Sequence, residues 1–135
     1  MSRTLAAAFT VVLSHAAAHA AWPEKPIRLV VPYAPGGNID ITARTIAPGM
    51  SDALAAQIVI DNRGGAGGTI GTEVVAKSPP DGYTLLLATA GNAANVAMES
   101  KLPYDLLKDF APVSHVVNVP FVLTAHPRLP ATLPE

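Results

Sequence analysis

Three short runs of β-branched and aliphatic residues each lead through a loop into a helical pattern. The runs predict strands at Ile27–Pro32, Ile58–Ile60 and Tyr83–Thr89. The helical patterns that follow them cover Ile39–Leu54, Thr69–Lys77 and Ala93–Met98. Parallel strands need crossover connections, which are usually helices, so this alternation predicts an α/β fold with a largely parallel sheet.

Two features complicate this pattern. Pro48 and Gly49 lie inside the first predicted helix, and an interior proline costs about 3 kcal/mol, so we expect a bend there or two shorter helices. One or two more strands are predicted at Ala111–Val117 and Val119–Ala125, interrupted at Asn118 and Pro120.

The first 20 residues have the three regions of an export signal. Arg3 supplies the positive charge, Leu5–Leu13 the apolar segment, and Ala18-His19-Ala20 a small-residue cleavage site, which predicts cleavage before Ala21. The apolar segment is shorter than the roughly 20 residues that span a bilayer. A buried N-terminal helix is the alternative. Export without a lipid-anchoring cysteine predicts a soluble protein in a bacterial periplasm.

Composition excludes several classes of site. The chain has no cysteine, so disulfides and thiolate metal sites are excluded. Removing residues 1–20 takes away Arg3 and no acid, which leaves eight basic and ten acidic side chains, a formal charge of −2. A protein that binds nucleic acid or an anionic membrane needs a basic patch, and this balance offers none.

The loops after the three strands are the candidate binding region. In a parallel sheet, ligands bind beyond the carboxyl ends of the strands, which here are followed by Tyr33–Asn38, Arg63–Gly68 and Thr89–Asn92. Gly36 and Gly37 lead directly into a helix, whose first N–H groups lack internal partners and favour anions. The alternative is an ordinary turn capped by Asn38 or Asp40. Asp40 either caps the helix or holds a water, a ligand hydroxyl or an ammonium group.

Catalytic and cofactor motifs are scarce. The run from Gly65 to Gly71 resembles a dinucleotide fingerprint, but Ile70 stands where its third glycine is required. Outside the leader the chain has two histidines, His115 in a strand pattern and His126 beside a proline, and neither has an evident Ser or Asp partner. No cluster of three or four metal ligands is visible, so we expect no metal, no cofactor and no enzymatic activity.

Four sequence blocks resemble the Bug-type extracytoplasmic solute-binding receptors of tripartite tricarboxylate transporters. The first block joins Trp22–Arg28 to Val31–Gly37 and Asp40, and the second joins Asp61–Arg63 to Gly65–Gly71. The third and fourth blocks are Ala76–Lys77 with Pro80–Leu86, and Leu102–Asp105 with Lys108–Val113. Their order and number make the resemblance specific, and it covers nearly all of the chain after the leader.

The resemblance implies a type II periplasmic binding protein, a two-lobed Venus flytrap that acts as a monomer with membrane transporter subunits. Its ligands would be small carboxylates, such as di- and tricarboxylates, acidic amino acids or aromatic acids, held largely by backbone N–H groups and ordered water. Carried over by position, the candidate ligand-binding residues are Tyr33, Ala34, Gly36, Gly37, Asn38, Asp40, Ala66, Gly67, Thr89 and Asn92.

The chain departs from the family pattern in sequence and in length. Ala55 stands where a glycine often closes the first helix, and Gln57 and Gly64 stand where proline is common. Family members are more than twice as long, so we expect residues 21–118 to form most of the first lobe and 119–135 to cross toward a second. Residues 21–135 alone are then expected to bind ligand weakly or not at all, because half of the cleft wall would be missing. The alternatives are an exported enzyme that uses His115, and a truncated remnant without function.

Overall fold

The computed structural model describes residues 22–120, 122 and 124. The elements follow in the order β1 (Ile27–Val31), α1 (Asn38–Leu54), β2 (Ile58–Asn62), η1 (Ala66–Gly68), α2 (Thr69–Ala76), β3 (Thr84–Leu86) and α3 (Ala90–Met98). The predicted alternation of strands and helices is therefore confirmed. The export signal and its cleavage site lie outside the described residues.

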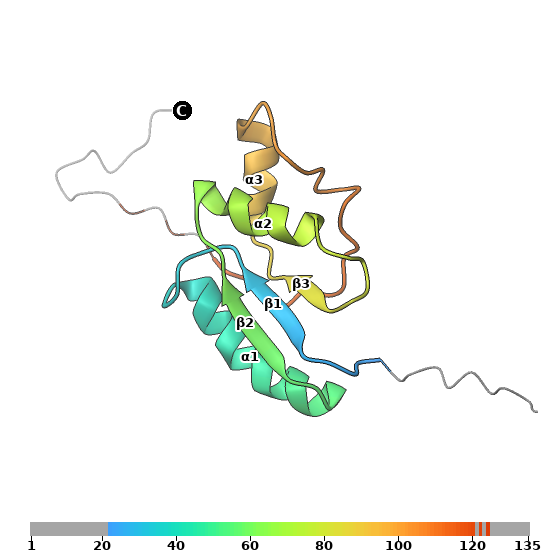
Figure 1. The fold of residues 1–135 in the computed structure, drawn as a ribbon. Helices are drawn as coiled ribbons and strands as arrows, with labels where there is room; N and C mark the ends of the chain where they lie inside the picture. The colour runs from blue at the N-terminus through green and yellow to red at the C-terminus, as the bar shows by residue number, and fades with distance from the viewer. Residues whose placement is uncertain (1–21, 121, 123, 125–135) are drawn as a thin grey trace, which may run out of the picture.

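The three strands form one parallel sheet in the order β2-β1-β3. Ile27 pairs with Ile58, and Leu29 pairs with both Ile60 and Leu85. The chain moves from β1 to one side for β2 and then across β1 to the other side for β3. Right-handed crossovers in opposite directions place their helices on opposite faces, and Figure 1 shows α1 and α2 on either side of the strands.

The core lies between β1 and α1. Ile27, Leu29 and Val31 alternate along β1 and pack with Ala43 and Ala47 of α1, all of them buried. The small alanines let the helix approach the sheet closely. Val30 points to the opposite face and is also buried, so β1 is the central strand, with both faces covered.

Gly71 fixes the distance between α2 and the sheet. A Cβ placed on Gly71 would lie 2.6 Å from the carbonyl oxygen of Arg63 and 2.7 Å from Cα of Pro32. Since both of these are backbone atoms, only glycine allows this approach. The contact joins the segments that leave β1 and β2, and so it holds two of the predicted binding loops together.

Several predicted boundaries are corrected. α1 is a single helix of 17 residues with Pro48 inside it, so the two-helix alternative is wrong. The strand predicted at Tyr83–Thr89 is limited to Thr84–Leu86, which pair with Arg28–Val30 of β1. The loop predicted at Thr89–Asn92 contains the N-cap and the first turn of α3, which begins earlier than the predicted Ala93 because Thr89 and Asn92 form a capping box.

The strand predicted at Ala111–Val117 is wrong. Residues 111–117 form no helix or strand and are exposed, whereas Phe110 just before them is partly buried. β-branched composition makes a segment suitable for a strand, but a strand also needs a neighbour with free backbone groups. Of the segment Val119–Ala125, residues 121, 123 and 125 lie outside the described part, and the described residues form no strand.

No helix among the described residues has both the length and the apolar character needed to cross a bilayer.

Candidate ligand-binding site

Three helix N-termini meet at the carboxyl edge of the sheet. α1 begins at Asn38, α2 at Thr69 after the η1 turn, and α3 at Ala90. Each follows a parallel strand, so all three point their N-terminal N–H groups toward the same rim. Partial positive charge from three helix ends therefore gathers at one place.

The three predicted loops are joined by direct contacts. The hydroxyl of Tyr33 in the first loop lies 2.8 Å from Oγ1 of Thr89 in the third. A Cβ on Gly68 would lie 3.3 Å from the Tyr33 ring, and one on Gly91 only 2.8 Å from its hydroxyl. Tyr33 thus packs between the second and third loops, and the prediction that these loops share one edge is confirmed.

Four predicted site residues are exposed at this rim. Gly37, Asn38, Ala66 and Gly67 are exposed. Within residues 22–120, none of their amides donates a hydrogen bond to another atom of the chain. Gly67 has a φ of +61° and Ala66 one of +45°, a left-handed pair that turns the second loop sharply before α2. The rim therefore presents unpaired donors from two loops.

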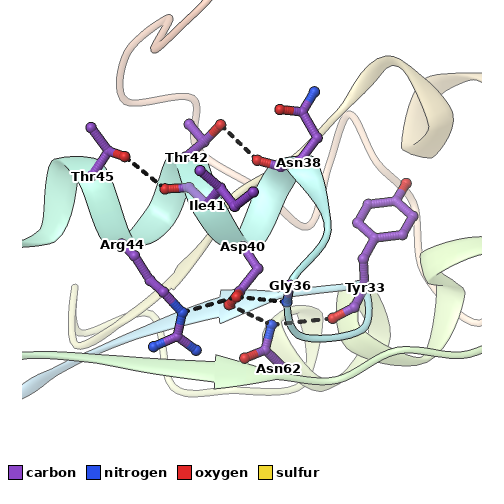
Figure 2. A network of polar contacts seen from close by, with 9 residues as sticks. All are labelled: Tyr33, Gly36, Asn38, Asp40, Ile41, Thr42, Arg44, Thr45 and Asn62. Carbon is purple, nitrogen blue, oxygen red and sulfur yellow. Dashed lines mark hydrogen bonds and ion pairs between the residues drawn. The ribbon is translucent and has the colours of Figure 1, made fainter.

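Asp40 has a different position from the one predicted for a helix cap. The N-cap of α1 is Gly37, and no side chain caps it, so capping by Asn38 or Asp40 is wrong. The Asp40 carboxylate, 3% exposed, accepts a hydrogen bond from the Gly36 amide (2.9 Å) instead. Its other donors are Arg44 Nε (2.9 Å) and Asn62 Nδ2 (3.0 Å) (Figure 2). Asp40 therefore holds the turn that precedes Gly37.

The same network connects the first loop to β2. Asn62, the last residue of β2, also donates to the carbonyl oxygen of Tyr33 at 3.3 Å. The hydrogen bond from Arg44, then those from Gly36 and Asn62, hold the pKa of Asp40 well below its usual range, although burial opposes them. Asp40 is thus a charged anchor at neutral pH.

Asn92 lies beneath the rim. Its side chain is 0% exposed, its Oδ1 accepts from the Thr89 amide (2.8 Å), and its Nδ2 donates to Oγ1 of Thr72 (2.7 Å). Thr72 in turn donates to the carbonyl oxygen of Gly68 at 2.9 Å. This buried chain of hydrogen bonds connects the third loop to the second. Asn92 therefore shapes the rim from below, with its side chain away from solvent.

The remaining predicted residues are distributed around the rim. Ala34 and Gly36 are exposed in the first loop, and Tyr33 and Thr89 are half-buried where the first and third loops meet. Gly36 has a φ of +81°, which favours glycine. Sequence reasoning missed Arg44, Asn62 and Thr72. A polar residue at the carboxyl end of β2 was the available signal for Asn62.

A large apolar hollow adjoins the rim. Its volume is about 2020 Å³, and its lining includes Tyr33, Gly37 and Asn38 at the rim together with Leu29 and Met50. Sites for small molecules usually measure about 300–1,000 Å³, so a small ligand would not fill this space. Orientation of a ligand would then depend on the polar rim.

The described residues offer little for catalysis or metal binding. His115 is exposed in a segment without regular structure, and its predicted place in a strand is wrong. Across residues 22–120, no group of three His, Asp or Glu side chains is arranged to hold a metal ion. Arg28 and Arg63 both pair with Asp61 at the edge strand, as structural arginines do.

Comparison with known proteins identifies the family. Residues 42–134 match the model of the tripartite tricarboxylate transporter family receptor. BugT from Bordetella pertussis is 44% identical over 110 residues, which are 80% of this chain and 34% of BugT. The chain spans about a third of the length of the curated relatives it matches.

Solved structures agree with this match. MatC from Rhodopseudomonas palustris, solved with bound malate, aligns with a TM-score of 0.68 and 42% identity over 70% of this chain and 33% of MatC. A second R. palustris protein, solved with adipate, aligns with a TM-score of 0.50 and 46% identity. The alignment covers 52% of this chain and 23% of the R. palustris chain. The α/β fold is thus that of periplasmic binding proteins. The family consists of receptors rather than enzymes, and the chain belongs to the tripartite tricarboxylate transporter receptors.

Proposed function

We propose that this chain forms the N-terminal part of a periplasmic solute-binding receptor that captures a small carboxylate. The observation that carries the proposal is the convergence of three helix N-termini and unpaired loop amides on one rim. Amides held in place by the fold bind a carboxylate without the cost of ordering a flexible side chain.

Three groups of residues have separate roles in this proposal. Gly37, Asn38, Ala66 and Gly67 donate their amides to the ligand, while Tyr33, Ala34, Gly36 and Thr89 border it. Asp40 and Asn92, whose side chains are 3% and 0% exposed, hold the loops that carry those amides. In this proposal they reach the ligand only through water or through the loops.

The ligand class follows from charge and from the relatives. Malate and adipate, bound in the two R. palustris structures, are both dicarboxylates. A rim rich in amide donors suits one carboxylate, and the second would extend over the hollow. We therefore propose a dicarboxylate or a similar small acid, delivered to the membrane subunits of a transporter after the two lobes close around it. The leader, residues 1–20, would direct export, with cleavage before Ala21.

Titration of the full chain with paired ligands tests this function. Two-dimensional NMR detects millimolar binding, so malate and adipate would be titrated beside their neutral diamides. The expected result is that the acids shift the amide signals of Gly37, Asn38, Ala66 and Gly67, and that the diamides do not. Equal shifts with acids and diamides, or shifts confined to other residues, would contradict the proposal.

A further inference from the structure

Asp40 raises an electrostatic difficulty for the proposed site. Its carboxylate lies 2.9 Å from the Gly36 amide, directly before the Gly37 and Asn38 amides proposed to hold an anion. The side chain is 3% exposed, so water does little to screen it. At a separation of about 8 Å, an uncompensated charge in such surroundings would weaken anion binding by about tenfold or more.

Arg44 removes this difficulty. It follows Asp40 by one helical turn and donates from Nε to Oδ2 at 2.9 Å. Figure 2 shows the carboxylate between Arg44 on one side and Gly36 on the other. A guanidinium keeps its charge at every physiological pH, so the pair is neutral as a whole.

No other arginine of the described residues can take this role. Arg28 and Arg63 both form ion pairs with Asp61. Apart from Arg44, the donors to the Asp40 carboxylate are the backbone amide of Gly36 and the side-chain amide of Asn62, and both are neutral. Arg44 is also half exposed at 57%, so solvation alone does not require it to fold back onto Asp40.

We infer that Arg44 is a positioning residue of the site, which neutralises Asp40 so that the first loop can hold an anionic ligand. Asp40 then fixes the Gly36 turn without repelling the ligand. The inference rests on the proposed function. It assigns Arg44 to the ligand's electrostatics, whereas a purely structural ion pair would leave ligand affinity unchanged.

The test measures malate affinity of the full chain by NMR titration in wild type and four variants. Arg44→Gln should weaken malate binding about tenfold, while Arg44→Lys should stay within about threefold because it keeps the charge. The Asp40→Asn/Arg44→Gln double variant should recover most of the loss, because it removes the charge that Arg44 compensates. Lys77→Gln breaks an ion pair of the same i,i+4 spacing, with Glu73, and should leave affinity unchanged.

The outcomes separate the inference from the function. The role of Arg44 would be overturned if Arg44→Gln and Lys77→Gln had the same malate affinity. It would also be overturned if the double variant bound malate as weakly as Arg44→Gln alone. If wild type does not bind malate or adipate, the proposed function fails for these acids. A ligand-free measurement then still tests the premise that Arg44 compensates the Asp40 charge: the Asp40 carboxyl carbon, followed by NMR against pH, should show a higher pKa in Arg44→Gln. An unchanged pKa would overturn the inference.

Discussion

The first loop is fixed by a charged carboxylate, whereas the second and third loops are fixed by neutral groups. Asp40 holds Gly36 with Arg44 and Asn62 beside it. Asn92 and Thr72 connect Thr89 to Gly68 without any charge. Both networks keep backbone amides available on one rim, but only the first can respond to pH and salt. The comparison shows that similar loops can be held by chemistry of very different sensitivity.

The contact of Gly71 with the segments that leave β1 and β2 gives the largest expected effect on stability. Gly71→Ala would place a Cβ 2.6 Å from the Arg63 carbonyl oxygen and 2.7 Å from Pro32 Cα, so the backbone must move. We expect a loss of about 3 kcal/mol in unfolding free energy, measured by urea denaturation. Gly49→Ala is the matched control, because a Cβ there meets nothing within 4 Å, and it should stabilise α1 by about 0.5–1 kcal/mol. Equal effects at both positions would contradict the packing account.

The neutral network comes next. Asn92→Ala leaves the Thr89 amide and the Thr72 hydroxyl without their buried partner, which should cost about 2–3 kcal/mol at any pH between about 5 and 8. Asn95→Ala is the control, because Asn95 bonds the Gly67 carbonyl oxygen from a more exposed position and should cost less than about 1 kcal/mol. A pH-dependent loss in Asn92→Ala would show that this network is not neutral.

The charged network predicts a pH dependence. Since the pKa of Asp40 is lowered in the folded protein, its charge stabilises the fold above the usual carboxyl pKa, and this contribution is lost as pH falls. Asp40→Asn should therefore melt below wild type at pH 7, and the difference should shrink steadily below about pH 4. Thermal melts of the two proteins from about pH 7 to pH 2.5 provide the measurement. A constant difference over this range would mean that Asp40 acts through shape alone.

The smallest effect comes from a left-handed residue outside both networks. Ala55 closes α1 with φ 50° and ψ 34°, a left-handed conformation that favours the glycine often found at this position in the family. Ala55→Gly should raise stability by at most about 1 kcal/mol, because glycine relieves the strain but gains freedom in the unfolded chain. Denaturant unfolding measures this change in unfolding free energy. A less stable Ala55→Gly variant would contradict the interpretation that Ala55 is strained.

The sequence alone predicted which loops form the rim better than it predicted the side chains that hold those loops in place. Strand and helix order fixed which loops meet, so Tyr33, Gly37 and Gly67 were placed correctly at one edge. The roles of Arg44 and Thr72 depend on side-chain positions after folding, which helical spacing alone does not specify. The strand expected at Ala111–Val117 failed because composition indicates suitability for a strand but not the presence of a neighbouring strand.

The proposed role of backbone amides is tested most directly at Asn38. Asn38 is the first residue of α1, where proline is favoured, and Gly37 before it is extended at ψ 168°, as a residue before proline requires. Asn38→Pro therefore removes one N–H from the rim without breaking the helix, whereas Asn38→Ala removes only the side chain. The account predicts that malate binding by the full chain weakens about tenfold in Asn38→Pro and stays near wild type in Asn38→Ala, with similar stability in both. Unchanged affinity in Asn38→Pro, or an equal loss in both variants, would contradict it.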